Sequence, residues 1–571
     1  MNILLIAGRD ALSEGIERGL RRRRGELSVW RFRSAPDFSE VGADFSTAPT
    51  SADAGASAAV YLAGPRGKYR GVEPDLKDAE ACFRALATSG VEHAVVMSSA
   101  AVHEPSAHHL QWIDEVRCAP RRTGNPIPDR WQALERLAEQ HLAAGGLTVL
   151  RPTPTLVPGG RDFWSRRVRR RLALTTPGYD PVVQLLDLED LLSALGLVID
   201  RAPAAGTVAV YHVAPAAPVP LAAALRRAQT IRLPVPVSLQ APVRALLAAA
   251  GRAAPTRQLD WTRHPSTVSD RRIRGHLGYA ARYSSLEAID RCRTPSAEPR
   301  RIPIEPDRFG LDKAYHRRLS KTLFRFLQRL WWRVDYRGLE RVPTQGPAVL
   351  AGVHRGFQPW DGVMAMDQIV RTRGRYLRFL VHPTLFKPPV LTPYMQKLGG
   401  VPACRAHAEW VLDGGGLLGI FPEGIRGAFR PYGPDVYRLG KFGRNEYVRF
   451  AIRAGAPIVP FVTVGSAEIF PILGRVDWPW WRRVVEWPYF PITPTLGLVP
   501  LPAKWHTRFL EPEPTEHFGP EAAEDREIVS AVSQRVKERM QAALEDLLAR
   551  RRHRFWGDLS EYPAEAGGDG L

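Results

Sequence analysis

Strand-length apolar runs alternate with amphipathic stretches through the first half of the chain. The runs include NILLIA at 2–7, AAVYLA at 58–63 and LTVLRP at 147–152, and a helical period covers Ala11 to Arg24. Short buried strands that alternate with helices predict a parallel sheet covered on both faces. Further strands are expected at 29–32, 93–99 and 207–213, and further helices at about 75–89 and 130–144. The pattern therefore predicts a doubly wound α/β domain over residues 1–293.

A linker separates this domain from a second set of elements. Residues 294–313 hold four prolines and many charges without any period, which is typical of a connecting segment. Residues 314–560 again alternate strand-length apolar runs with helical periods, so we expect a second α/β domain there. Residues 561–571 are rich in glycine, alanine and acid, and are expected to be a disordered tail.

The charge of the chain is strongly positive. It has 79 Lys and Arg against 59 Asp and Glu, a formal net charge of +20. Such a field attracts phosphates on nucleic acid, on anionic lipid or on a phosphorylated substrate. An arginine-biased composition in an ordinary soluble protein produces the same charge, so charge alone selects no partner. Because the sequence contains no recognised nucleic-acid module, we expect no specific nucleic-acid partner.

Cysteine usage and hydropathy bear on the compartment. The four cysteines are scattered without a CxxC pair, which predicts neither a disulfide framework nor a metal site. The opening MNILLIAGRD has no basic residue before its short apolar run, so it indicates a buried strand and not a signal peptide. No run approaches the roughly 18 apolar residues that span a bilayer. We therefore expect a cytoplasmic protein that lies peripherally on the inner face of the cell membrane.

Two segments favour contact with a membrane surface. Residues 314–333 predict a basic amphipathic helix with six apolar residues near one face: Leu319, Leu323, Phe326, Leu327, Leu330 and Trp331. Such a helix can lie among lipid headgroups, and it can equally pack on its own domain. Residues 477–492, DWPWWRRVVEWPYFPI, are dense in Trp, Pro and Arg. Aromatic rings with polar edges suit the membrane interface or the cap of an acyl-chain tunnel.

A histidine and an aspartate form the first candidate for chemistry. In AVLAGVHRGFQPWDGVM, residues 348–364, an apolar strand ends near His354 and Asp361 opens a helical stretch. A histidine is suited to take a proton from a hydroxyl that attacks a thioester, and a carboxylate on its other ring nitrogen fixes the tautomer. Gly356 and Pro359 exclude a regular helix between them, so a loop must bring the pair together.

Three further motifs accompany this pair. They are KLGGVPACR at 397–405, LLGIFPEGIRG at 417–427 and GAPIVPFVTVG at 455–465. The ordered set resembles the glycerolipid and lysophospholipid acyltransferase superfamily over most of residues 335–530. The six residues between His and Asp, the Pro-Trp before the Asp, and GSAEIFPIL at 465–473 are similar to its monoacylglycerol-acyltransferase-like subgroup.

The resemblance implies a set of roles. His354 would be the general base and Asp361 its orienting carboxylate, with acyl-CoA or acyl carrier protein as the donor. The acceptor pocket would be lined by Phe421, Pro422, Glu423, Gly424 and Arg426, with Arg405 near it. Guanidinium groups suit a phosphate because they bind it through two parallel hydrogen bonds. Ile425 stands where the family has a small residue, which leaves the acceptor open between a lysophosphatidic acid and another lipid alcohol.

The first half resembles the extended short-chain dehydrogenase/reductase family of NAD-dependent epimerases and dehydratases. This resemblance implies a Rossmann-like fold. The resemblance rests on VVMSSAAVH (95–103), LTVLRPTPTLVPGG (147–160), LLDLEDLLSAL (185–195) and TVAVYHV (207–213). The glycine-rich turn of that family keeps only its first glycine, Gly8, and the two later positions are Ala11 and Glu14. We expect the Glu14 carboxylate to clash with helix packing and to repel a pyrophosphate.

The proton-transfer residues of that family are also replaced. Trp131 and Glu135 stand where its tyrosine and lysine would be, although Ser98 and Ser99 remain. We therefore expect a catalytically degenerate domain without bound NAD(P), and an acyltransferase as the chain's activity with no cofactor required. The alternative is an NAD(P)-dependent oxidoreductase or epimerase whose C-terminal domain is a membrane-targeting accessory. A non-catalytic membrane adaptor remains a third hypothesis, and the oligomeric state is left open.

Overall fold

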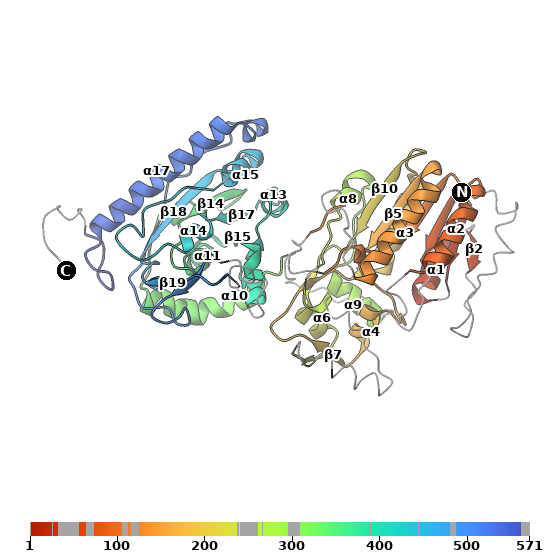
Figure 1. Cartoon of the computed structure of the whole chain (residues 1–571), viewed down its shortest axis with the longest axis horizontal. Coiled ribbons are helices and arrows are strands. Elements are labelled where there is room, and N and C mark those ends of the chain that lie inside the picture. The colour runs from red at the N-terminus through yellow and green to blue at the C-terminus, as the bar shows by residue number, and fades with distance from the viewer. Residues whose placement is uncertain are drawn as a thin grey trace. The chain divides into compact units, whose positions relative to one another are not determined.

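The computed structural model divides into two compact units, Met1–Gly310 and Leu311–Leu571, shown in Figure 1. The structure describes residues 2–8, 10–24, 27–31, 56–63, 74–105, 112–115, 125–236, 239, 242, 261–264, 266–294, 309–386, 391–443, 445–479 and 487–560. Residues 295–308 of the expected linker, 480–486 of the Trp-rich segment and the expected tail at 561–571 lie outside this set.

The N-terminal unit is built on a parallel sheet of six strands in the order β10-β5-β4-β3-β1-β2. The strands are β1 (Ile3–Ala7), β2 (Leu27–Arg31), β3 (Ala58–Leu62), β4 (His93–Met97), β5 (Leu147–Pro152) and β10 (Val208–Val213). The main helices are α1 (Ala11–Arg24), α2 (Leu76–Thr88), α3 (Pro126–Leu142) and α5 (Leu188–Asp200). The predicted doubly wound α/β fold is confirmed.

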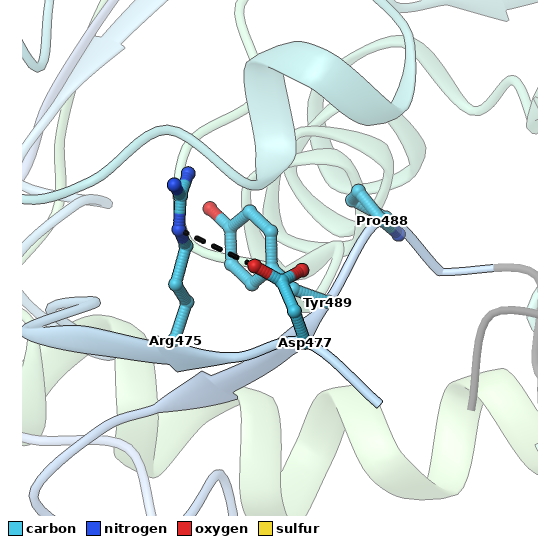
Figure 2. A pocket seen from close by; sticks show the side chains of 4 residues that line it. All are labelled: Arg475, Asp477, Pro488 and Tyr489. Carbon is cyan, nitrogen blue, oxygen red and sulfur yellow. Dashed lines mark ion pairs between the residues drawn. The ribbon is translucent and has the colours of Figure 1, made fainter. Parts of the chain in front are cut away.

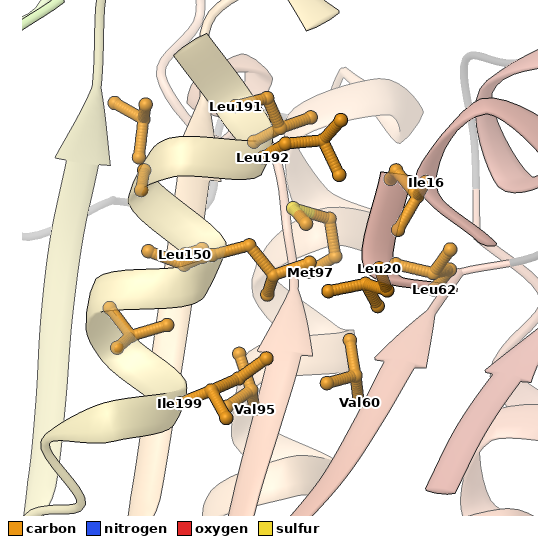
Figure 3. Packing of buried hydrophobic residues seen from close by; sticks show 14 of the residues in the cluster. Ile16, Leu20, Val60, Leu62, Val95, Met97, Leu150, Leu191, Leu192 and Ile199 are labelled. Carbon is orange, nitrogen blue, oxygen red and sulfur yellow. The ribbon is translucent and has the colours of Figure 1, made fainter. Parts of the chain in front are cut away.

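Helices cover both faces of this sheet because successive strand residues point to opposite sides. Ile3 and Leu5 of β1 pack with α1 and α5 in one buried cluster, part of which Figure 3 shows around Ile16 and Leu192. Leu4, between them in sequence, lies in the second cluster, which contains residues of α2 and α3. Continuous apolar strands are what a sheet buried on both faces requires.

The packing of α1 on α5 corrects one expectation. Glu14 is exposed and does not clash with helix packing. The close approach is provided by the next residue, Gly15, where an added Cβ would lie 2.7 Å from Leu188 Cδ2. Gly19, one turn later, is closer still, since an added Cβ would lie 2.3 Å from Leu192 Cδ1. The expectation for Glu14 was wrong because the glycine spacing in this turn is one residue longer than we assumed.

Shorter elements complete the N-terminal unit. They are η2 (Ala100–Val102), η3 (Ala143–Gly145), β6 (Thr155–Leu156), α4 (Phe163–Arg169), β7 (Leu172–Thr175), β8 (Val182–Val183), β9 (Leu186–Asp187), β11 (Val219–Pro220), α6 (Leu221–Arg227), β12 (Ile231–Pro234), α8 (Arg271–Leu277) and α9 (Ser285–Arg293). Residues from α4, α6 and α9 form a separate buried cluster.

The C-terminal unit has a sheet of seven strands in the order β13-β21-β18-β14-β17-β15-β16. They are β13 (Asp335–Arg337), β14 (Ala348–Gly352), β15 (Leu377–Val381), β16 (Val401–Pro402), β17 (Leu417–Ile420), β18 (Ile458–Val464) and β21 (His506–Phe509). Only the β18–β21 pair among these is antiparallel. Strand β14 is central, so the residues that follow it emerge at the carboxyl edge, where ligands bind in open α/β sheets.

Helices and two short strands surround this second sheet. They are α10 (Lys313–Leu319), the π-helical turns η5 (Ser320–Phe324) and η6 (Leu327–Trp331), η7 (Leu339–Arg341), α11 (Trp360–Arg373), η8 (Pro383–Phe386), α12 (Leu391–Lys397), α13 (Arg405–Asp413), α14 (Ile425–Ala428), α15 (Glu446–Ala454), β19 (Gly474–Val476), β20 (Phe490–Ile492), η9 (Pro520–Ala523) and α17 (Arg526–Arg550). In the part of the chain that the structure describes, no helix is long and apolar enough to cross a bilayer.

The predicted helix at 314–333 forms, and its apolar residues include both buried and exposed positions. Phe324 and Leu327 are buried, whereas Leu323, Phe326 and Leu330 are exposed. The helix contains two π-helical turns, which change the angular spacing of its side chains.

Candidate active site

The structure brings His354 and Asp361 into direct contact. His354 follows the central strand β14, and Asp361 is the second residue of α11. Between them the chain turns at Gly356, whose φ of +72° lies in the left-handed region that favours glycine. The His354 Nδ1 atom is 2.9 Å from each carboxylate oxygen of Asp361. The loop anticipated from Gly356 and Pro359 is therefore the element that joins the pair.

The Asp361 carboxylate is buried and held by backbone donors. Its side chain is fully buried, whereas that of His354 is 11% exposed. In addition to its contact with the imidazole, the Asp361 carboxylate accepts hydrogen bonds from the backbone N–H of Arg355 at 3.1 Å and of Gly362 at 2.8 Å. A carboxylate only accepts, so Nδ1 of His354 carries the ring proton and Nε2 presents its lone pair. The arrangement can therefore take up a proton at Nε2.

An aromatic stack fixes the plane of the imidazole. Phe421 lies over the His354 ring with centroids 4.8 Å apart and planes at 30°. Phe379 stacks behind Phe421 at 5.1 Å. Glycines make room for this stack, since a Cβ at Gly352 or Gly362 would lie 2.9 or 3.1 Å from the Phe421 ring. Phe421, which the resemblance assigns to the acceptor pocket, thus contacts the candidate base directly.

Glu423 of the F-P-E-G motif is engaged in a buried ion pair. Its Oε2 lies 2.6 Å from Nη1 of Arg355, and its Oε1 accepts from the backbone N–H of Gly440 at 2.7 Å. The Glu423 side chain is only 8% exposed. Both carboxylate oxygens therefore have protein partners, and Glu423 serves this turn as a structural anchor.

Arg355 is the residue that sequence reasoning missed. It is 0% exposed, and its guanidinium also donates to the carbonyls of His354 at 2.9 Å and Val436 at 2.6 Å. The sequence offered one sign of it, an arginine immediately after His354 and a glutamate after the strand that pairs with β14. That sign is usable only when β14 and β17 are known to be neighbours.

The remaining residues of the F-P-E-G turn differ in exposure. Pro422 is buried and its carbonyl accepts from Gly443 at 2.8 Å. Gly424 has φ +60° and ψ −149°, a conformation essentially restricted to glycine. Arg426 follows on the one-turn helix α14, and its side chain is exposed. Arg426 is therefore a cation presented to solvent two residues beyond the anchored turn.

Arg405 is held on the surface by a local ion pair. It is the first residue of α13, and its Nε lies 2.6 Å from Glu409 one turn later. Its side chain is 50% exposed. The contacts described for it do not include His354, Asp361 or the F-P-E-G turn.

An open pocket lies at the hairpin of β19 and β20. It has a volume of about 450 Å³ and is lined by Arg475, Asp477, Pro488 and Tyr489, which Figure 2 shows around the hairpin of β19 and β20. The Tyr489 hydroxyl donates to the carbonyl of Phe429, just after α14. Phe429 and Phe357, of the loop that carries His354, belong to one aromatic cluster with Trp487. Tyr489 of the pocket is thus linked through Phe429 and Phe357 to the loop that carries His354.

The N-terminal unit places its own polar network where its resemblance would put proton-transfer residues. Glu135 accepts from Ser98 Oγ at 2.5 Å and from both Nε and Nη2 of Arg151, at 2.9 and 2.7 Å. At the start of α1, the Asp10 carboxylate accepts from the backbone N–H of Leu12 and Ser13. A helix N-terminus is where a pyrophosphate binds in dinucleotide folds, and here two of its N–H groups donate to Asp10.

Metal ligands are a separate question. Among the residues that the structure describes, no three His, Cys, Asp or Glu side chains gather closely enough to hold a metal ion.

Comparison with known proteins identifies the second unit. A family model described as Acyltransferase matches residues 333–464, which contain His354, Asp361, Arg405 and the F-P-E-G turn. This chain belongs to the acyltransferase family. An uncharacterized protein of Mycobacterium tuberculosis (strain ATCC 25618 / H37Rv) is 37% identical over 259 residues, 44% of this chain and 72% of that protein.

Two relatives with descriptive names align over shorter stretches. The "DGAT1/2-independent enzyme synthesizing storage lipids" of Bos taurus is 28% identical over 202 residues, 35% of this chain and 57% of the relative. Phytyl ester synthase 2 of Arabidopsis thaliana is 35% identical over 146 residues, 24% of this chain and 20% of the relative. Both alignments cover a minority of this acyltransferase chain.

Among solved structures, the similar chains span about half of this protein. MoeE5 in complex with UDP-glucuronic acid and NAD covers 51% of this chain and 96% of its own, with 17% identity and a TM-score of 0.39. A short-chain dehydrogenase/reductase superfamily protein from Agrobacterium tumefaciens covers 51% of this chain with a TM-score of 0.38. At these values the likeness carries no functional argument.

Proposed function

We propose that this acyltransferase moves a fatty acyl group from a thioester, acyl-CoA or acyl carrier protein, to the hydroxyl of a (lyso)glycerolipid or a related lipid alcohol. The contact between His354 Nδ1 and the buried Asp361 carboxylate carries the proposal. It leaves Nε2 as the free basic atom, directed by a carboxylate that backbone donors hold in place.

The reaction needs one base and no covalent acyl-enzyme. Nε2 of His354 takes the proton of the acceptor hydroxyl as its oxygen attacks the thioester carbonyl. The tetrahedral intermediate then collapses, the C–S bond breaks, and the imidazolium returns the proton to the thiolate. Asp361 stays ionised throughout and stabilises the imidazolium. A base of this kind contributes roughly 10² to 10⁴ in rate.

The lipid nature of the acceptor is supported by two observations. The relatives in Bos taurus and Arabidopsis thaliana are named for the synthesis of storage lipids and of phytyl esters, and both products are lipids. The aromatic cluster of Phe357, Phe429 and Trp487 places apolar side chains at the loop that carries His354. The exposed Arg426 is a cation that a phosphorylated acceptor could use, whereas an uncharged lipid alcohol would not need it.

The acceptor can be identified by extraction. The full chain is incubated with a mixture of acyl-CoAs, lysophosphatidic acid, monoacylglycerol and a long-chain alcohol, and the lipids are analysed by mass spectrometry. We expect one acylated acceptor to accumulate with the wild type and not with His354→Ala. Arg426→Gln should lower product from the phosphorylated acceptor alone if phosphate binds there. Absence of any acylated lipid with the wild type would refute the proposal.

We also propose that the N-terminal unit performs no hydride transfer and does not bind NAD(P). The proposal is supported by the Asp10 carboxylate at the start of α1, which would repel a pyrophosphate, and by the Arg151–Glu135 ion pair. The competing hypothesis, an oxidoreductase or epimerase, requires the cofactor. Quenching of NADPH fluorescence or a rise in melting temperature at micromolar NAD(P) would therefore contradict our proposal.

A further inference from the structure

The helix that runs from α10 through η6 has its polar residues inside and large apolar residues outside. His316, Ser320 and Gln328 are buried, with 1%, 8% and 8% of their surface exposed. On the same helix Leu323, Phe326 and Leu330 are 41%, 46% and 67% exposed. A helix that faces only water has the reverse distribution. The outward apolar residues therefore indicate a surface that meets something other than water.

A buried carboxylate fixes this orientation. Asp367, on α11, is 0% exposed and accepts from Gln328 Nε2 at 2.8 Å, and His316 Nε2 lies 3.2 Å from it. Arg371, one turn further along α11, donates to the Ser320 carbonyl. Rotating the helix to bury its apolar residues would remove Gln328 and His316 from Asp367 and leave this buried carboxylate with Arg371 of its own helix, a loss that opposes the rotation.

A second exposed apolar segment lies alongside the helix. Leu496, Leu498 and Val499 are 62%, 83% and 58% exposed. The segment is tied to the helix because Trp331 Nε1 donates to the Pro500 carbonyl at 2.9 Å and Trp332 Nε1 to that of Leu501 at 3.2 Å. Figures 1 and 2 both show the light-green helix running beside the hairpin of β19 and β20 that precedes this segment.

The second segment also adjoins the catalytic loop. Gln358 Nε2 donates to the Gly497 carbonyl at 2.5 Å. Gly497 packs so closely on Phe357 that a Cβ there would overlap the ring. Phe357 and Gln358 lie between His354 and Asp361 in the chain. The exposed apolar residues are thus connected, contact by contact, to the loop that carries the base.

The charge on the helix matches an acidic surface. Between Lys313 and Arg333 the chain has seven Lys and Arg and no Asp or Glu. Lys321, Arg325 and Arg329 are exposed among the apolar residues. Basic side chains that flank exposed leucines and aromatics favour the headgroup region of an anionic bilayer. An uncharged surface would gain nothing from this density of positive charge, and a second copy of the chain has the same net charge of +20.

We propose that these two segments form one docking face, which inserts into the surface of an anionic phospholipid bilayer. The docking face consists of the basic residues of the helix and six apolar residues: Leu323, Phe326, Leu330, Leu496, Leu498 and Val499. The face holds the loop that carries His354 near the layer from which a lipid acceptor enters. This last statement rests on the proposed function, whereas docking itself does not.

Vesicle binding of the full chain tests the docking face. His354→Ala protein is sedimented with vesicles of phosphatidylcholine alone or mixed equally with phosphatidylglycerol, so binding is read without turnover. We expect binding to the anionic vesicles that falls about tenfold or more in Leu323→Glu/Leu330→Glu and in Leu496→Glu/Leu498→Glu. Leu548→Glu, at an exposed leucine of α17, and Leu172→Glu, in the N-terminal unit, are the matched controls and should bind as the parent does.

Each other outcome overturns the proposal. Failure of the parent protein to bind anionic vesicles means that no bilayer occupies the face. An equal loss of vesicle binding in the two leucine controls would mean that an added negative charge weakens binding wherever it is placed on the protein. If the parent protein is a dimer and the two double variants are monomers, the face binds a second copy of the chain and not a bilayer. Circular dichroism of each variant excludes unfolding, and acyl transfer by the wild type remains a separate measurement.

Discussion

Arg355 and Glu423 form a buried ion pair directly behind the candidate base. The guanidinium lies 2.6 Å from the carboxylate and also donates to the carbonyl of His354. Arg355 is fully buried, and the backbone N–H of the same residue donates to Asp361. One residue therefore links the F-P-E-G turn, the His354 backbone and the orienting carboxylate. We infer that the glutamate of this motif acts here by positioning the catalytic loop.

Removing one member of this ion pair should lower the stability of the protein more than removing both members. Arg355→Met leaves Glu423 buried with only the more distant Arg430, 3.9 Å away, as a cation, and should destabilise the C-terminal unit by about 3–5 kcal/mol. The double variant Arg355→Met/Glu423→Leu removes both charges and should be more stable than the single one. Urea unfolding followed by fluorescence measures both. Arg405→Met breaks an Arg–Glu pair of the same 2.6 Å length on the surface, and should cost less than about 1 kcal/mol. Equal costs at the two sites would refute the positioning role.

Loss of charge at Asp361 should affect turnover far more than binding. Asp361→Asn keeps the shape of the side chain but removes the charge that supports the imidazolium, and its amide can face a ring nitrogen with the wrong tautomer. We expect kcat to fall by roughly 10² to 10⁴ with little change in KM for acyl-CoA. Steady-state kinetics with thiol detection would show this. A raised KM with unchanged kcat would instead make Asp361 a binding residue.

Gly424 should not tolerate a side chain, for a reason of backbone conformation alone. An added Cβ there would meet no atom within 4 Å, yet φ is +60° and ψ is −149°. Gly424→Ala should therefore cost about 1–3 kcal/mol and displace the turn that holds Glu423. Gly433→Ala is the matched control, since its surroundings are equally open and its φ is not positive. Thermal unfolding of the two variants compares them, and equal melting temperatures would contradict the prediction.

Stability of the C-terminal unit should fall in acid through Asp367. Burial alone would raise the pKa of Asp367, but the adjacent His316 and Ser320 and the Arg371 guanidinium outweigh it, so this pKa lies below its ordinary value. A carboxyl whose pKa is depressed on folding contributes stability that is complete above its unfolded pKa of about 3.9 and is lost as the pH falls through the folded value.

The comparison of two asparagine variants tests that linkage. Asp367→Asn should be less stable than the wild type near neutral pH and should lose less stability below about pH 4. Asp558→Asn is the control, because its side chain is 90% exposed in its pair with Lys504 and should change neither value. Urea unfolding across the acid range gives the two curves. Parallel curves for wild type and Asp367→Asn would mean that Asp367 does not contribute.

Local patterns were sufficient for the fold and for the central pair. The apolar runs predicted β1, β3 and β5, and the helical period predicted α1 to the residue, since hydrophobic periodicity follows from neighbours along the chain. The motif spacing also anticipated that a loop would join His354 to Asp361. These features depend on residues close in sequence, which one chain suffices to read.

Contacts between residues far apart in the sequence could not be predicted from these local patterns. The Arg355–Glu423 pair depends on β14 and β17 being neighbours, although 68 residues separate its members. The outward apolar residues of the helix depend on Asp367, a carboxylate buried in another helix. The glycine that brings α1 against α5 was misplaced by one position, because spacing along α1 does not reveal which side faces Leu188.

Thiol release from acyl-CoA in the presence of a lipid acceptor tests the central claim most directly. The assay compares the wild type with His354→Ala at equal concentration, after circular dichroism has shown equal folding. If Nε2 of His354 is the base, the variant should release free CoA at a rate lower by roughly 10² or more, with matching loss of acylated lipid. A folded His354→Ala protein that turns over at the wild-type rate would contradict the account.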